Sequence, residues 1–320
     1  MNSVLITGAD GFVGRVLVPT MQVAGMRVVA VTRRPGARTL DGVLTVCIED
    51  IRKIVDWDRM LTEVDVVIHL AARAHVIAES AGDPLQEFRD TNVTPTLNLF
   101  RACQRARVSR FVFVSTIGVN GLVSHRNEFR ATDIPDPQEP YSVSKWQAER
   151  GLMDLAAQGE TKVVTIRPTL VYGPGAKGNF LRLMRLIRSG WPLPLGAICA
   201  KRSILSVTSL CELLLKASQC REAEGRIFLA ADPTPIRTRD LVIGLSALMG
   251  RPARLVRIDP RILVGLGRIV GFGPEMDRLT APLVVDSTPA RELLDWNDDG
   301  NSARDMKRMV DDFLGKNHVA

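Results

Sequence analysis

A tyrosine and a lysine stand four residues apart in the stretch Tyr141-Ser-Val-Ser-Lys145, directly after Pro140 and at the start of a helix-forming run. Residues four apart share one face of a helix, so the lysine ammonium is expected beside the phenol. A neighbouring positive charge lowers the pKa of a phenol from its usual value of about 10. The pair predicts a tyrosine that exchanges protons near neutral pH, although the same spacing is common in solvated neighbour pairs.

Two hydroxyl side chains follow a very apolar stretch, Arg110 to Ser115, which reads as a central strand. Side chains at the carboxyl end of such a strand point into the crevice where parallel sheets bind ligands. Thr116 is therefore the first candidate for a hydrogen bond to a substrate oxygen, and Ser115 is the second. The alternative is an ordinary polar cap at a strand end.

Glycines 8, 11 and 14 lie between a short apolar strand at the N-terminus, Ser3 to Thr7, and a helical pattern that runs to about Ala24. Glycines in a strand–turn–helix allow a tight turn, close approach of backbone to a pyrophosphate and helix–strand packing. The helix N-terminus also offers free N–H groups to an anion. The stretch predicts a dinucleotide site, with the spacing Gly-x-x-Gly-x-x-Gly in place of the ordinary Gly-x-Gly-x-x-Gly.

The end of the second predicted strand, Arg27 to Thr32, is where a dinucleotide fold selects its cofactor. A carboxylate there binds the ribose 2′-hydroxyl of NAD, whereas arginine suits the 2′-phosphate of NADP. This chain has Thr32, Arg33 and Arg34 at that point and no carboxylate. NADP(H) is therefore favoured over NAD(H), with a solvated loop as the alternative interpretation.

Three further positions could line the same site. Asp50-Ile51 follows the predicted strand Val43 to Ile48 and could contact the adenine, or simply open a loop. Ala71-Ala72 follows the predicted strand Asp65 to Leu70, and such small residues leave room for a cofactor at the sheet edge. Asn92, inside a predicted helix from Pro84 to Val108, either braces the active-site backbone or belongs to a polar stripe.

The order of elements predicts an α/β chain: a Rossmann doubly wound parallel sheet with an interleaved smaller C-terminal substrate (cap) domain. We expect 1–175, with about 203–231, to form the dinucleotide-binding domain, and 176–202 with 232–320 to bind the substrate. In the second half, residues 168–175 are expected to form a loop. Lys201 to Val207 and Arg254 to Ile258 are expected to form strands.

The composition excludes several classes of protein. The 320 residues are 46% hydrophobic and 24% charged, as expected for a globular chain. Five scattered cysteines without Cys-x-x-Cys spacing argue for a reducing compartment and against a metal site. No apolar run reaches the roughly 18 residues of a membrane span, and no signal peptide is recognisable, so a cytoplasmic location is expected. The net charge of +7 comes with no nucleic-acid motif.

Taken together and in order, these motifs resemble one family. They are the three glycines, Ala71-Ala72, Asn92, Ser115-Thr116, Tyr141-x-x-x-Lys145 and Arg167-Pro-x-x-Val-Tyr-Gly-Pro. The chain resembles, over essentially its whole length, the extended short-chain dehydrogenase/reductases, and within them the NAD(P)-dependent nucleotide-sugar epimerase/dehydratase group. Two local phrases, around residues 69–75 and 178–183, resemble a bacterial subgroup that acts at C4 of UDP-hexoses in surface-polysaccharide synthesis.

The resemblance implies a role for each matching residue. Tyr141 would be the acid/base on a sugar hydroxyl or ketone, Thr116 would hydrogen-bond the same oxygen, and Lys145 would hold the nicotinamide ribose. Asn179 and Arg202 would contact the diphosphate of the sugar nucleotide, with Arg278 as a second clamp; a solvated surface arginine is the alternative for both arginines. The residues expected to contact the cofactor are Gly8, Gly11, Phe12, Val13, Gly14, Thr32, Arg33, Arg34, Asp50, Ile51, Leu70, Ala71, Ala72, Arg73, Asn92, Ser115, Tyr141, Lys145 and Pro168.

Departures from the family pattern narrow the reaction. The 4,6-dehydratases carry an Asp-Glu pair after the catalytic threonine, where this chain has Ile117-Gly118, so elimination of water is rejected. The absent carboxylate near Thr32 favours a UDP-4-keto-6-deoxyhexosamine reductase that forms UDP-N-acetylquinovosamine. The alternative is a UDP-glucose or UDP-N-acetylglucosamine 4-epimerase that retains NAD. A non-catalytic NADP-sensing regulator is disfavoured because Tyr141 and Lys145 are both present.

The resemblance also implies a homodimer. Family members often dimerise through the helix that carries the tyrosine and the helix before it. Here those helices correspond to about Pro84–Val108 and Tyr141–Ala157, where the apolar residues Leu97, Phe100, Trp146 and Leu152 are compatible with such an interface.

Overall fold

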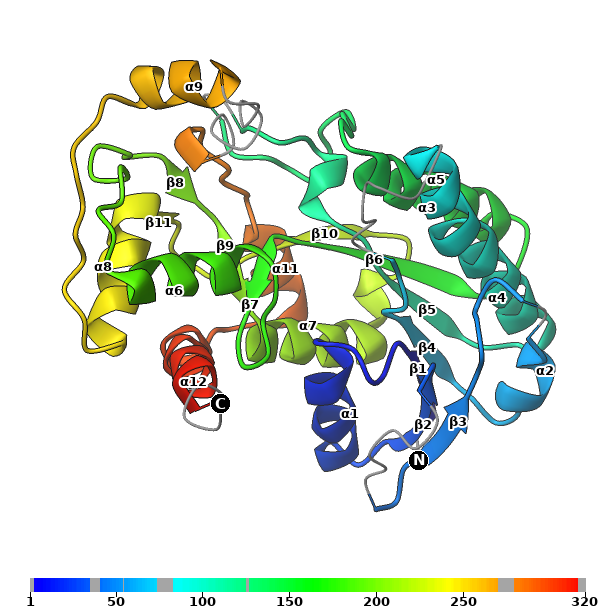
Figure 1. Cartoon of the computed structure of the whole chain (residues 1–320). Helices are drawn as coiled ribbons and strands as arrows, with labels where there is room; N and C mark the ends of the chain where they lie inside the picture. The colour runs from blue at the N-terminus through cyan, green and yellow to red at the C-terminus, as the bar shows by residue number, and fades with distance from the viewer. Residues whose placement is uncertain are drawn as a thin grey trace.

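A seven-stranded parallel sheet forms the centre of the computed structural model (Figure 1), which describes residues 3–34, 41–53, 55–73, 83–124, 127–269 and 279–315. The strand order, β10-β6-β5-β4-β1-β2-β3, places β2 and β4 on either side of β1. This reversal of direction is the switch point at which doubly wound sheets bind ligands. The strands are β1 (Ser3–Thr7), β2 (Arg27–Thr32), β3 (Leu44–Cys47), β4 (Val66–His69), β5 (Arg110–Val114), β6 (Lys162–Pro168) and β10 (Ile227–Ala230).

Helices cover both faces of the sheet. Successive side chains of a strand point to opposite faces, so Val4 and Ile6 of β1 join one apolar cluster while Leu5 joins the other. The first cluster packs under α1 (Gly14–Val23), α7 (Val207–Gln219) and α11 (Thr288–Leu294). The second packs under α2 (Trp57–Met60), α4 (Thr94–Arg105) and α5 (Pro140–Ala156). The near-continuous apolar runs of the strands reflect this burial on both faces.

One predicted helix is two helices. The stretch from Pro84 to Val108 forms α3 (Pro84–Asn92) and α4, which meet at Val93. Pro95 explains the break, because it has no N–H to bond the carbonyl of Thr91 and its ring would collide with that carbonyl in a continuous helix. The break matters for the site because Asn92 ends α3 instead of lying inside a helix.

A third apolar cluster lies outside the sheet and forms the core of the cap. It combines α6 (Asn179–Ser189), α8 (Thr238–Leu248) and α12 (Asn301–Gly315) around buried Phe180, Leu245 and Phe313. Two small sheets complete it: β7 (Leu170–Tyr172) with β9 (Ile204–Ser206), and β8 (Lys201–Arg202) with β11 (Ile236–Arg237). Figure 1 shows this part to one side of the large sheet, with α9 (Pro260–Ile269) at its far edge.

Three predictions for this half were wrong. Residues 168–175 do not form only a loop, because Leu170–Tyr172 pairs with β9 as a short parallel strand. The predicted strand at 254–258 is a single bridge, from Leu193 to Leu255. The predicted strand from Lys201 to Val207 splits at Ser203 into β8 and β9. Such short pairings depend on partners distant in sequence, which local propensity does not contain.

Two of the four apolar residues considered for a dimer face point inward. Phe100 and Leu152 are fully buried in the cluster under α4 and α5, so that part of the prediction was wrong. Leu97 packs against Gly151, where a Cβ would lie 2.9 Å from the leucine methyls. Within the described residues, no helix is long and apolar enough to cross a membrane.

Candidate active site

The glycine turn after β1 is closely packed. Gly8 has φ of 69°, in the left-handed region that favours glycine, and a Cβ there would lie 3.0 Å from the backbone nitrogen of Ala71. A Cβ on Gly14 would lie 2.4 Å from the carbonyl oxygen of Gly8. The turn therefore brings the end of β1, the end of β4 and the first residue of α1 together, which fits a pyrophosphate cradle. Phe12 and Val13 of the turn pack against the sheet cluster.

The two hydroxyls at the end of β5 lie in different environments. Ser115 is buried, and its Oγ has no hydrogen-bond partner among the described residues. Thr116 is half-buried and accepts a hydrogen bond from Gly118 N (3.2 Å) at the start of a 3₁₀ turn, Ile117–Val119. A Cβ on Gly118 would lie 2.2 Å from Oγ of Ser142, so this glycine lets the turn approach α5 directly beside Tyr141.

Tyr141 lies in the first turn of α5, with its ring edge-on to Phe88 at 5.9 Å. Among the described residues no hydrogen bond from its hydroxyl is found. Burial raises the pKa of Tyr141 to about 12. The predicted lowering of this pKa by Lys145 was therefore wrong for the protein alone, where loss of hydration raises the pKa.

Lys145 is almost completely buried, with its Nζ 4.0 Å from the centre of the Phe113 ring. Burial lowers its pKa to about 7, although Glu149, one turn further along α5, opposes that shift. Both oxygens of Glu149 accept hydrogen bonds from Arg167, at 3.0 and 2.6 Å, and no hydrogen bond from Lys145 to Glu149 is found among the described residues. The structure thus keeps a desolvated cation next to the catalytic candidate, in a setting typical of functional sites.

A buried hydrogen-bond chain connects the sheet to the helix of Tyr141. His69 on β4 bonds Oγ1 of Thr7 (2.8 Å) and Oγ1 of Thr96 (2.9 Å), and burial lowers its pKa to about 3, so it is neutral. Asn92 holds the backbone of Arg73 through bonds of 2.9 and 3.1 Å and donates to Oγ of Ser144 (3.1 Å). This is the bracing geometry that one interpretation of Asn92 required.

The residues expected to select the cofactor are already engaged with protein groups. Arg34 forms an exposed ion pair with Asp10 of the glycine turn (3.5 Å), while Arg33 is exposed. Thr32 is buried at the end of β2. The Asp50 carboxylate is bound by Arg52, which lowers the pKa of Asp50, and the Ile51 side chain packs into the core.

These features fit a dinucleotide. The glycine turn leaves a backbone cradle at the sheet's switch point, and Ser115 and Lys145 offer polar atoms there that the protein does not otherwise satisfy. Leu70, Ala71 and Ala72 are half-buried beside that turn. No cluster of residues suited to a metal ion is found in the described parts of the chain.

The residues proposed for the substrate lie on the cap side. Asn179 is exposed and opens α6 after Gly178, so the free N–H groups of that helix are available to an anion. Arg202 is half-buried, and one of its nitrogens donates to the carbonyl of Ala281 (3.1 Å). Pro168, which was expected to contact the cofactor, is buried at the end of β6. Arg278 lies outside the described residues.

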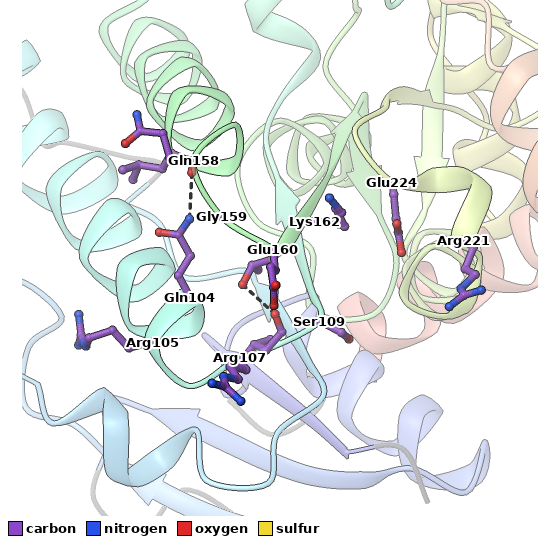
Figure 2. A pocket seen from close by; sticks show the side chains of 13 residues that line it. Gln104, Arg105, Arg107, Ser109, Gln158, Gly159, Glu160, Lys162, Arg221 and Glu224 are labelled. Atoms are coloured by element: carbon purple, nitrogen blue, oxygen red, sulfur yellow. Dashed lines mark hydrogen bonds between the residues drawn. The ribbon is translucent and has the colours of Figure 1, made fainter.

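A depression of about 1260 Å³ lies elsewhere (Figure 2). It is lined by Gln104, Ser109 and Lys162, and so lies at the amino ends of β5 and β6. The predicted catalytic residues follow the carboxyl ends of the same strands or begin the next helix. The depression is therefore at the opposite edge of the sheet and is not the dinucleotide site.

Several residues of the site were missed in the sequence. Glu149 had a local signal, because it lies four residues after Lys145, and Arg167 belongs to a motif that was noted without a role. His69, Thr7 and Thr96 had none, because each contributes one group to a chain of bonds that joins segments far apart in sequence.

Comparison with known proteins places this geometry in a family. The model of the NAD dependent epimerase/dehydratase family matches residues 4–231. A relative from Vibrio cholerae described as UDP-glucose 4-epimerase is 35% identical over 99% of this chain and 97% of its own length. A structure of MoeE5 in complex with UDP-glucose and NAD is 25% identical, with a TM-score of 0.77, and covers 99% of this chain and 100% of its own.

A second solved structure supports the fold alone. UDP-glucuronic acid 4-epimerase from Bacillus cereus, in complex with NAD, superposes with a TM-score of 0.78 at 20% identity, covering 97% of this chain and 96% of its own. The fold and the family expected from the motifs are confirmed. The chain is an enzyme of the NAD-dependent epimerase/dehydratase family, a branch of the extended short-chain dehydrogenase/reductases.

Proposed function

We propose that the protein is a UDP-hexose 4-epimerase that retains NAD through its catalytic cycle. The observation that carries the chemistry is the arrangement of Tyr141 and buried Lys145 on α5, beside the hydroxyls that end β5. The substrate class is supported by the relative described as UDP-glucose 4-epimerase, which matches nearly the whole chain.

Tyr141 is the proton carrier in this proposal. As the C4 hydrogen leaves as hydride, the Tyr141 phenolate takes the hydroxyl proton, and a 4-ketone forms. The bound nicotinamide supplies the acceptor and donor of that hydride. After the ketone turns its other face, Tyr141 returns the proton as hydride returns, which yields the C4 epimer. Thr116 donates a hydrogen bond to the reacting oxygen.

Tyr141 needs a nearby positive charge to act as a base in this proposal. The pKa of Tyr141 is about 12 in the protein alone, which makes it a poor base at neutral pH. An oxidised nicotinamide is cationic, and a positive charge near a phenol lowers its pKa. Lys145, with a pKa of about 7, contributes the same effect when protonated.

Gly118 favours hydride and proton transfer at one carbon over the elimination of water. A Cβ at this position would lie 2.2 Å from Oγ of Ser142, so a carboxylate side chain such as the dehydratases carry here would require Ser142 to move. The site therefore keeps one proton carrier, which suffices for oxidation and reduction at a single carbon.

A reductase that uses NADP(H) is the second candidate, and one observation favours it. No carboxylate stands at Thr32-Arg33-Arg34, where NAD enzymes bind the ribose 2′-hydroxyl. Against it, Arg34 is paired with Asp10, and the two compared structures that carry a cofactor contain NAD. The predicted homodimer and the division into two domains remain proposals.

The test compares the two reactions on the purified protein. An epimerase should hold NAD(H) in stoichiometric amount and convert UDP-glucose or UDP-N-acetylglucosamine to the galacto epimer with no added cofactor. Substrate deuterated at C4 should keep its label. An empty protein that oxidises NADPH only in the presence of a UDP-4-ketohexose would instead establish the reductase.

A further inference from the structure

Hydrogen bonds at the outer end of the cap join the end of α6, the segment that follows it and the segment that follows α8. Nη1 of Arg251, just after α8, donates to the carbonyl of Arg188 at the end of α6 (3.1 Å). Leu193 N donates to Arg254 O (2.8 Å), and Val256 N donates to Leu193 O (2.9 Å). In Figure 1 the chain after α8 runs along the left edge of the molecule, beside these segments.

Large apolar side chains are exposed on this surface. Trp191 is 73% exposed, Leu186 is 49%, Val256 is 44% and Leu248 is 41% exposed. Their chain neighbours Leu193 and Leu255 point inward and pack in the cap core. The exposed side chains therefore lie on the outer face of the two paired segments. We call Leu186, Trp191, Leu248 and Val256, with the exposed Arg185, Arg254 and Arg257, the cap-end patch.

The cap-end patch is built from chain segments without carboxylates. Residues 161–211 contain no Asp or Glu, and neither do residues 241–258, which Asp240 and Asp259 flank. Among the described residues, Arg185, Arg254 and Arg257 make no ion pair. The patch therefore combines exposed apolar surface with uncompensated positive charge.

We propose that the cap-end patch docks on the surface of an anionic lipid bilayer. Tryptophan has an apolar body with one polar group and settles at the level of lipid headgroups. Arginine forks bind lipid phosphates, and their stems cover apolar surface. A second copy of the chain fits less well, because a two-fold contact would place each arginine cluster against its own copy.

The docking is interfacial, since no helix in the described residues could span a bilayer. Helix α6 relates the patch to the proposed substrate site. It begins at Asn179 and ends at Ser189 beside Trp191, and its eleven residues span roughly 16 Å. Docking by the cap-end patch thus holds the substrate side one helix length from the membrane surface.

Vesicle sedimentation tests the proposal with the full chain. Vesicles of phosphatidylcholine alone are compared with vesicles containing 30% phosphatidylglycerol, at low and high salt. The protein is expected to sediment with the anionic vesicles at low salt and to be released by high salt, because the attraction is screened. Brominated lipid should quench the fluorescence of Trp191, and a Trp191→Phe variant should lose that quenching, because Trp57 and Trp296 are buried and the half-buried Trp146 lies on α5, outside the cap.

Two variants and a matched control test the patch itself. Trp191→Ser should lower vesicle affinity about tenfold. Arg254→Ser with Arg257→Ser should lower it roughly thirty-fold. The control, Val23→Ser with Arg59→Ser, removes the same kinds of exposed group at other sites and should bind as wild type. All three variants should keep wild-type turnover of UDP-sugar without vesicles. Turnover therefore tests the proposed function, and vesicle binding tests membrane docking independently of it.

Three results would overturn the proposal. One is the absence of binding to anionic vesicles at low salt. Another is an equal loss of vesicle affinity in the patch variants and in the control variant. The last is a wild-type dimer in light scattering that Trp191→Ser converts to a monomer, which would assign the patch to a second copy of the chain.

Discussion

The chain has only two tyrosines, and their sites contrast, because Tyr172 is fully buried and Tyr141 is half-buried at the start of α5. The hydroxyl of Tyr172 donates to Asp232 (2.7 Å) and to the carbonyl of Ser302 (3.1 Å), joining β7 to the cap. For the hydroxyl of Tyr141 no such partner is found in the described parts of the chain. Burial raises the pKa of both phenols, and the carboxylate of Asp232 raises that of Tyr172 further.

The same contrast holds for the charged groups around each tyrosine. At the junction with the cap, Asp305 is buried and accepts from Ser206 and Thr208, so its charge is satisfied. Near Tyr141, Lys145 is equally buried but has only an aromatic ring beneath it. A network whose hydrogen-bonding groups are all satisfied stabilises the fold, whereas one with unsatisfied polar groups can bind a ligand.

The largest expected effect separates the two tyrosines. Tyr141→Phe should reduce kcat at least about a thousandfold, because it removes the group that carries the proton. Stability measured by urea denaturation should stay close to wild type, because no protein hydrogen bond is lost. Tyr172→Phe is the matched control and should retain most of the activity. A Tyr141→Phe enzyme with substantial turnover would show that another group is the acid/base.

Lys145→Met should reduce kcat about a hundredfold and raise the melting temperature. The folded-state pKa of Lys145 is about 7, below 10.5, so the unfolded chain binds the additional proton between these values. The lysine therefore costs stability fully below about pH 7, and the cost fades as the pH rises toward 10.5. Lys145→Met should lack this increase of stability with pH, whereas Lys53→Met on the surface should retain it. Unchanged stability in Lys145→Met would contradict the assigned cost of burial.

Tyr172→Phe should destabilise the protein by about 1–3 kcal/mol, because it leaves the buried Asp232 carboxylate without one of its donors. The midpoint and slope of urea unfolding measure the change. The expected kcat stays within about twofold of wild type, since the hydroxyl faces the cap junction. A large loss of activity without a loss of stability would place Tyr172 in the catalytic machinery.

The smallest expected effect is a pH dependence of stability at Asp232. Burial raises its pKa from 3.8 to about 6, so the folded state binds the additional proton between these values. Stability should therefore increase as pH falls from about 6 toward 4, by less than about 3 kcal/mol. Asp232→Asn should remove this increase in urea titrations at several pH values. An unchanged pH profile in the variant would assign the titration to another group.

Local sequence was sufficient to predict the motifs that depend on backbone geometry. Gly8 and Gly14 could be placed in a phosphate-binding turn because only glycine tolerates such close backbone approach, and the structure shows contacts that a Cβ would violate. The alternation of buried strands and helices likewise predicted a doubly wound parallel sheet. The break at Pro95 was also present in the sequence, as a proline within a helical pattern, but was not used.

The charge state of the site could not be predicted in the same way. Spacing placed Lys145 one turn from Tyr141, and it suggested a lowered tyrosine pKa. Only the tertiary structure decides how much water each group loses, and burial raises the pKa of Tyr141 and lowers that of Lys145. Arg167, brought in by β6, also pairs with Glu149, whose charge raises the pKa of Lys145 but does not offset the effect of burial.

The amino-acid sequence by itself determined the family and the doubly wound sheet, and it predicted the reacting groups, because these depend on residue types at short spacing. The tertiary structure decided which polar groups are satisfied. His69 is neutral because it is buried, its two ring nitrogens are bonded by Thr7 and Thr96 from other elements, and Oγ of Ser115 has no partner among the described residues. Such long-range pairing depends on packing across the sheet, and no local pattern encodes it.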